Sequence, residues 1–146
     1  MPYSYEYPRL MLTVDAVVFR RNEPILEVLL IRRKHEPYAG MWALPGGFVD
    51  MDETVEEAIE RELEEETGLE MDSLKQLYTF SAIGRDPRGR SVSVTFYGQI
   101  DMDNSFVEGG DDADEARWFS VDQLPELAFD HIKAVNMAQS QIDSIH

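Results

Sequence analysis

Three glutamates in this sequence have a spacing that suits metal chemistry. Glu62, Glu65 and Glu66 stand three and four positions apart, so a helix would carry all of them on one face. Like charges at this spacing repel, but a hard divalent cation that accepts two or three of the carboxylates would reverse the penalty. The alternative is a solvated acidic face, because exposed charge is normal on helices. Four more glutamates keep that alternative open: Glu56, Glu57, Glu60 and Glu64.

The residues around these glutamates follow a longer pattern. From Gly47, five residues lead to Glu53, and seven more lead to the run 61–69, which reads RELEEETGL. This spacing matches G-x5-E-x7-R-E-U-x-E-E-x-G-U, where U is aliphatic, at every specified position. Average residue usage makes a chance match in a chain of this size a roughly one-in-a-million event or rarer. On this motif the sequence resembles the Nudix hydrolase family.

The resemblance implies a fold and a metal site. The flanking strand order and the chain length are also similar to the family's. The expected fold class is therefore α/β, a Nudix-type α/β/α sandwich with a mixed β-sheet, as a single domain over residues 1–146. The implied cofactor is Mg²⁺ or Mn²⁺. The ligands implied by the resemblance are the carbonyl of Gly46 and the side chains of Glu62, Glu65 and Glu66.

Two further motif positions are expected to support this site. Glu53 and Arg61 would pair with each other and, by family analogy, hold the glycine loop against the helix. The alternative for this pair is a surface salt bridge of little energetic worth. Gly46 and Gly47 would let the backbone turn tightly and come close to metal and phosphate.

The implied reaction is hydrolysis of a pyrophosphate link. The ion would neutralise developing charge and activate the attacking water, so positioning and electrostatics would carry the rate. Glu65 and Glu66 are the catalytic candidates on the helix. A general base is expected on the acidic loop beyond the motif, where Asp111 and Asp112 are the candidates and Glu115 stands behind them. A loop with no catalytic part is the alternative.

Segments outside the motif resemble the ADP-ribose pyrophosphatase branch of the family, namely 12–17, 38–48, 84–90 and 127–131. We therefore expect ADP-ribose as the substrate, hydrolysed to AMP and ribose 5-phosphate. Another nucleoside diphosphate sugar, a dinucleoside polyphosphate or an oxidised nucleoside triphosphate are alternatives. A further alternative is a non-catalytic ADP-ribose sensor. Related sensors carry a C-terminal winged-helix module, for which a chain ending at residue 146 leaves no room, so an enzyme is expected.

Basic and aromatic residues supply candidate substrate contacts. Five arginines are candidates to bind phosphate or ribose: Arg32, Arg33, Arg85, Arg88 and Arg90. A solubilising loop tip is the alternative for the last three of these. Phe48, Tyr38 and Phe80 are candidates to stack on adenine, whereas Trp42 is expected in the core.

Hydrophobic spacing predicts the elements that must position these residues. Strands are expected over 10–19, 27–32, 44–47, 74–82, 92–100 and 117–119. A helix is expected over 54–67, where Thr54 and Glu57 form a capping box and Gly68 ends the helix. A second helix is expected over 130–142. Its inward-facing residues are expected to be Ile132, Val135, Met137 and Ile142.

Composition sets the remaining limits. A chain of 146 residues that is 43% hydrophobic suits one globular domain, and the absence of cysteine excludes disulfides and thiolate metal sites. The sequence shows no signal peptide and no membrane-spanning stretch, so a cytoplasmic location is expected. A net charge of −16 argues against nucleic acid as a partner. The expected partner is a small-molecule nucleotide, and family analogy allows a homodimer.

Overall fold

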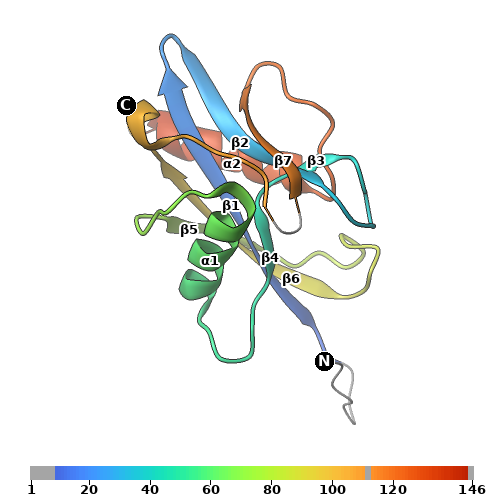
Figure 1. Ribbon diagram of the computed structural model, residues 1–146. Coiled ribbons are helices and arrows are strands. Elements are labelled where there is room, and N and C mark those ends of the chain that lie inside the picture. Colours follow the sequence, from blue (N-terminus) through green and yellow to red (C-terminus); the bar gives the residue numbers. More distant parts are fainter. Residues whose placement is uncertain (1–8, 111–112, 145–146) are drawn as a thin grey trace.

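The computed structural model describes residues 9–110 and 113–144 as a mixed sheet with helices on both faces (Figure 1). The elements in chain order are β1 (Met11–Asn22), β2 (Ile25–Arg33), β3 (Trp42–Ala43), β4 (Gly46–Phe48), α1 (Val55–Thr67), β5 (Lys75–Phe80), β6 (Ser91–Gln99), the 3-10 helix η1 (Met102–Asn104), β7 (Ala113–Ser120) and α2 (His131–Ser144). This arrangement confirms the expected α/β/α sandwich.

The sheet is organised around β1. The strand order is β3-β2-β1-β6-β5, with β4 paired to β1 and β7 paired to β2. One edge of β1 runs parallel to β6, and the other edge changes partner: residues 13–15 pair with β4 and residues 19–22 pair with β2. The short β4 therefore occupies the place beside β1 that β2 has left, and this brings the glycine turn into the middle of the sheet.

Helix α1 packs on one face of the sheet, and its ends lie where the sequence predicts them. The hydroxyl of Thr54 accepts from the Glu57 amide at 3.1 Å, and the Glu57 carboxylate accepts from the Thr54 amide at 2.9 Å. Gly68 ends the helix with φ 80°, a left-handed conformation that glycine adopts without cost. The apolar side of the helix joins the core through Ala58, Ile59 and Leu63.

Helix α2 packs on the opposite face. Its buried apolar residues are Ala134, Val135, Ala138 and Ile142, which join a second core cluster with residues of β1 and β2. The prediction is confirmed for Val135 and Ile142, and Met137 is half-buried. It is wrong for Ile132, which is 43% exposed. The helix begins at His131, whose side chain takes the inward position, so the next residue faces solvent.

Three other elements differ from the prediction. The expected strand over 44–47 is two short strands, β3 and β4, on either side of residues 44–45, where Pro45 has no amide to donate. Strand β7 is longer than expected because it pairs with β2 from Glu27 to Arg33. The turn η1 was not expected.

Over residues 9–110 and 113–144, no helix is long and apolar enough to cross a membrane.

Candidate active site

A cavity of about 250 Å³ lies where β4 inserts beside β1. Segments far apart in the sequence line it: β1, the end of β2, the glycine turn, α1, the loop between β5 and β6, and the start of α2. Residues from the helices on both faces and from the centre of the sheet therefore line a single cavity.

The glycine turn forms the wall nearest α1. The Gly46 amide donates to Glu66 Oε1 at 2.7 Å. A Cβ atom on Gly47 would overlap the Glu62 carboxylate, and one on Gly46 would overlap the backbone carbonyl of Val14. Gly46 therefore lies directly against the backbone of β1, whereas Gly47 lies directly against the Glu62 side chain of α1.

The three motif glutamates do not play equal parts. Glu62 and Glu66 are buried and line the cavity. The Glu65 side chain is 42% exposed, lies 3.2 Å from the Arg61 guanidinium and does not line the cavity. The structure therefore brings two of the three predicted carboxylates to the site, and it places the third at the rim of the helix.

Arg61 connects the helix to the loop that follows the glycine turn. Its guanidinium donates to both oxygens of Glu53, at 2.6 and 3.0 Å, and to the carbonyl of Phe48 at 3.0 Å. The hydrogen bond from Arg61 lowers the pKa of Glu53, and the Glu53 carboxylate in turn raises the pKa of Arg61. The pair thus clamps the loop onto α1, and its support of a metal site stays a prediction.

The donor set of this wall fits a hard cation. Among the described residues, no three side chains of the His, Cys, Asp or Glu types gather into a ready-made metal cluster. Two buried carboxylates stand instead beside the backbone of Gly46 and Gly47. Mg²⁺ is commonly held by one or two carboxylates together with substrate phosphates, so Glu62 and Glu66 suit a cation that arrives with a diphosphate.

The acidic loop approaches the same helix. A Cβ atom on Gly110 would overlap the carbonyl of Glu65 and lie 3.3 Å from Cα of Glu66. The next two residues, Asp111 and Asp112, are the predicted candidates for the general base and lie outside the described residues. Glu115, which was expected behind them, contacts Arg117 and lies 3.9 Å from Arg32.

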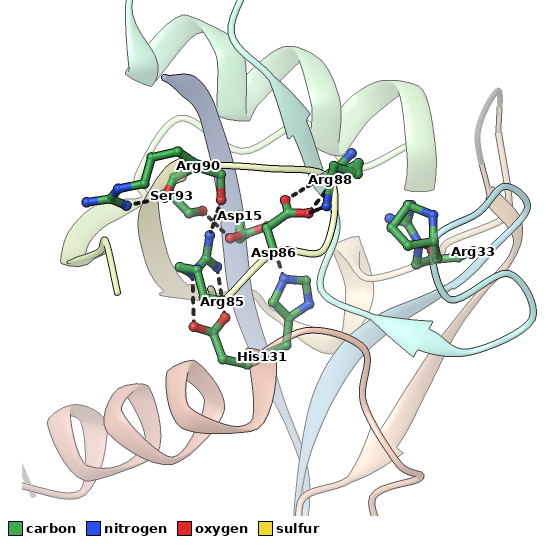
Figure 2. A network of polar contacts seen from close by, with 11 residues as sticks. Asp15, Arg33, Arg85, Asp86, Arg88, Arg90, Ser93 and His131 are labelled. Carbon is green, nitrogen blue, oxygen red and sulfur yellow. Dashed lines mark hydrogen bonds and ion pairs between the residues drawn. The ribbon is translucent and has the colours of Figure 1, made fainter. Parts of the chain in front are cut away.

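The loop between β5 and β6 forms the opposite wall, and carboxylates hold two of its arginines, Arg85 and Arg88 (Figure 2). The side chain of Arg85 is 6% exposed and donates to both oxygens of Asp130 at 2.8 and 2.9 Å. Burial lowers the pKa of Arg85, but Asp130 together with the charges of Asp15 and Asp86 outweighs that effect, and the net shift is upward. This pair ties the loop to the residue that precedes α2.

Arg88 is the more accessible arginine of this loop. Its Nε and one Nη donate to the buried carboxylate of Asp86 at 3.1 and 2.8 Å. Its guanidinium lies 5.0 Å from the ring centroid of Phe48 and 5.4 Å from that of Phe129. Asp86 and the two rings therefore fix the direction of the guanidinium at the cavity.

An aromatic group forms the third side of the cavity. Phe129 lines it and contacts the ring of Tyr38 edge-on, at 4.8 Å between centroids. Arg33, also on the cavity, lies 5.0 Å from the Phe129 ring. Phe129 and Tyr38 have φ values of 55° and 63°, and such backbone strain in larger residues concentrates at functional sites.

Other candidates lie away from the cavity. Arg32 and Arg90 are not among its lining residues, and Figure 2 shows the Arg90 side chain directed away from the polar network. Phe80 packs against Tyr78 on the edge strand β5. Trp42 packs edge-on against Phe119 beside the second core cluster, in line with its expected place in the core.

Several residues that line the cavity were not predicted from the sequence. Asp15 and His131 are both buried there, 3.5 Å apart between Oδ1 and Nε2. Burial raises the pKa of Asp15, but His131, the Ser93 hydroxyl and the charge of Arg85 outweigh it, so the pKa lies below its ordinary value of 3.8. A charged residue inside an apolar strand is a signal that would have drawn attention to Asp15.

The fold and the motif define a class of protein, and comparison with known proteins agrees with it. The chain belongs to the Nudix family, whose NUDIX domain model matches residues 9–138.

Two similar curated proteins carry ADP-ribose in their names. The chain is 45% identical over 122 residues to an ADP-ribose pyrophosphatase of Methanocaldococcus jannaschii, covering 84% of this chain and 69% of that protein. It is 32% identical over 143 residues to the ADPR responsive transcriptional repressor NtrR of Acinetobacter baylyi, covering 95% of this chain. The chain spans 57% of the length of that repressor.

Solved structures show the same fold. The NUDIX domain of Shewanella oneidensis NrtR, complexed with ADP ribose, superposes with a TM-score of 0.85 at 34% identity, covering 93% of this chain and 90% of that one. A MutT/nudix family protein from Enterococcus faecalis superposes with a TM-score of 0.87 at 34% identity, covering 98% of this chain and 66% of that one.

Proposed function

We propose that this protein hydrolyses the pyrophosphate link of ADP-ribose to AMP and ribose 5-phosphate with the help of Mg²⁺ or Mn²⁺. The observation that carries the proposal is the pair of buried carboxylates, Glu62 and Glu66, set against the backbone of Gly46 and Gly47. The similarity to an ADP-ribose pyrophosphatase supports the choice of substrate.

Glu62 and Glu66 would hold the cation, and the carbonyl of Gly46 is a third candidate ligand. A cation in this place would stabilise the negative charge that develops on the diphosphate oxygens. The Arg61 and Glu53 pair keeps the glycine turn at a fixed distance from α1, so the carboxylates need not rearrange when substrate arrives.

The other walls would bind the rest of the substrate. Arg88, fixed by Asp86, presents a guanidinium to the cavity and suits a phosphate oxygen. Phe48 and Phe129 line the cavity and are the candidates to stack on the adenine. Asp111 and Asp112 remain our candidates for the base that takes a proton from the attacking water, because the chain leads into them from Gly110 beside Glu66.

A sensor that binds ADP-ribose without cleaving it is the second candidate function. It is favoured by the similarity to a repressor and to a NUDIX domain complexed with ADP ribose. The enzyme is preferred because both glutamates suited to the cation are present and buried at the cavity.

A turnover screen separates the two functions. ADP-ribose, nucleoside diphosphate sugars, dinucleoside polyphosphates and oxidised nucleoside triphosphates are each incubated with the protein and Mg²⁺ or Mn²⁺. Release of AMP and ribose 5-phosphate, with ADP-ribose the best substrate, supports the proposal. Tight binding of ADP-ribose without turnover in either metal would establish the sensor instead.

A further inference from the structure

One buried carboxylate of the cavity has no part in the reaction described above. Asp15 lies midway along β1, between its partner residues Gly46 on β4 and Thr95 on β6, and it is 8% exposed. A carboxylate removed from water needs hydrogen-bonding partners to offset the loss of its hydration. The number of hydrogen bonds that Asp15 already accepts therefore shows whether its carboxylate can accept another from a ligand.

Two donors hold the Asp15 carboxylate (Figure 2). The Ser93 hydroxyl donates to Oδ2, and His131 Nε2 lies 3.5 Å from Oδ1. The Leu44 amide donates to His131 Nδ1 at 3.0 Å, so the ring proton stands on Nε2 and faces Asp15. A carboxylate offers about four acceptor sites, so these donors leave capacity for a group that enters the cavity.

The surroundings of Asp15 are rigid. Arg85 binds both oxygens of Asp130, the residue before His131, and its remaining Nη donates to the Ser91 hydroxyl at 2.9 Å. These bonds fix the start of α2 against β6. Asp15 and His131 are therefore already oriented before any ligand arrives, which is the condition for selective recognition.

The Gly46 backbone separates Asp15 from the carboxylates of α1. Its amide donates to Glu66 Oε1, and a Cβ atom on Gly46 would lie 2.8 Å from Asp15 Oδ1. A substrate whose diphosphate lies against Glu62 and Glu66 would extend along this turn past Asp15. A carboxylate repels phosphate but accepts from hydroxyl groups, so the part of the substrate beside Asp15 must carry hydroxyls.

We propose that Asp15 accepts a hydrogen bond from a ribose hydroxyl of the substrate and makes the cavity selective for ribose over deoxyribose. This inference rests on the proposed function, because it takes ADP-ribose as the molecule that spans the glycine turn. Ser93 and His131 are positioning residues that keep the Asp15 oxygens directed at the cavity.

The test compares ADP-ribose with two analogues that each lack the 2-hydroxyl on one of the two riboses. Dissociation constants are measured by calorimetry and kcat/KM by AMP release, for the wild type and for Asp15→Asn. A hydrogen bond to a charged acceptor predicts that the wild type prefers ADP-ribose over one of the analogues by about 10- to 100-fold. Asp15→Asn, which has the same shape without the charge, should lose most of that preference.

Two further variants serve as controls. Ser93→Ala removes one donor that orients Asp15 and should weaken the preference partly, without a direct contact to the substrate. Thr95→Val changes the buried cross-strand neighbour of Asp15, whose hydroxyl has no hydrogen-bond partner among the described residues. Thr95→Val should leave the preference unchanged.

Each outcome has a definite meaning. A wild type that does not distinguish either analogue from ADP-ribose refutes the role of Asp15, and this result needs no variant to fold. A preference that survives intact in folded Asp15→Asn refutes it as well. Absence of both binding and turnover with ADP-ribose would refute the proposed function, and the inference would fall with it. Normal turnover without any preference for the hydroxyl would refute the inference alone.

Discussion

Glu66 shows how single residues create this site. It is buried, and its Oε1 accepts from the amide of Gly46, so the backbone turn and the carboxylate fix each other. The Glu62 carboxylate occupies the space that a side chain at Gly47 would need. The two glycines therefore matter for different reasons, and substitution can separate them.

Alanine at these glycines should have different effects. In Gly46→Ala the new methyl group meets the backbone carbonyl of Val14, so we expect a loss of about 1–3 kcal/mol in the free energy of unfolding. In Gly47→Ala it meets only the end of the Glu62 side chain, so we expect a fold of near-normal stability and a kcat/KM reduced about 10- to 100-fold. Urea unfolding and AMP release measure the two effects. The reverse pattern would contradict the assigned roles.

Arg88 provides a second test at the level of a residue. Lysine keeps the positive charge but loses the paired hydrogen bonds to Asp86 and the flat stacking surface against Phe48 and Phe129. Arg88→Lys should raise KM about 10-fold or more. Arg90→Lys, on the same loop but away from the cavity, is the matched control and should leave KM unchanged. Equal effects of both substitutions would argue against a role for Arg88 in binding.

Helix α1 and the loop before it act together as one element. Arg61 joins them through Glu53 and the Phe48 carbonyl. Arg61→Ala should lower kcat/KM about 10- to 100-fold because the turn loses its fixed distance from the helix. The same change should cost only about 1 kcal/mol of stability, because the Arg61 side chain is partly exposed.

A matched change at another contact of the same helix checks this prediction. Gln76 donates to the Glu56 carboxylate at 2.9 Å in an exposed contact that also involves α1. Gln76→Ala should leave both kcat/KM and the unfolding free energy nearly unchanged. If Arg61→Ala were as mild as Gln76→Ala, the clamp between loop and helix would have no functional part.

The elements also show what the sequence could predict. Helix α1 was predicted closely because its capping box, its apolar stripe and Gly68 are all local signals. The hydrogen bond between Ser93 and Asp15 joins residues 78 positions apart, and no local pattern around either residue predicts it. Ile132 was misplaced because the helix turns the preceding residue, His131, into the cavity, and the apolar spacing alone does not show that a histidine is buried there.

The candidate site was predicted in part for the same reason. The motif pointed to Glu62 and Glu66 through spacing alone, and both line the cavity. Spacing could not show that Glu65 turns toward Arg61, because all three glutamates share the helix face in projection. It also could not show which arginines meet carboxylates, since that depends on how the β5–β6 loop folds back onto α2.

The whole molecule carries a net charge of −16, and Asp86 is one of its buried carboxylates. Burial raises the pKa of Asp86, but the hydrogen bonds with Arg88 and the charges of Arg88 and Arg85 together outweigh it, so the pKa lies below its ordinary value of 3.8. The stabilising contribution of Asp86 is therefore complete well above that value. It is lost as the pH falls through the lowered pKa of the folded state.

The pH dependence of unfolding should reveal this contribution. Between neutral pH and about pH 3, the unfolding free energy of the wild type should fall more steeply at the acid end than that of Asp86→Asn. Asp86→Asn should be the less stable of the two at neutral pH, because Arg88 loses its charged partner. The unfolding free energies are measured by urea unfolding at each pH. If the wild type and Asp86→Asn lost stability in parallel as the pH falls, the Asp86–Arg88 pair would contribute nothing to acid sensitivity.

The central claim is that two buried carboxylates beside a glycine turn make this Nudix domain a metal-dependent pyrophosphohydrolase. The most direct measurement is AMP release from ADP-ribose with Mg²⁺ by the wild type, Glu66→Gln and Glu64→Gln. Glu64 lies on the same turn of α1 but is exposed, so it is the matched control. We predict that Glu66→Gln folds normally and loses at least about 100-fold in kcat, while Glu64→Gln matches the wild type. Full activity in folded Glu66→Gln would contradict the claim.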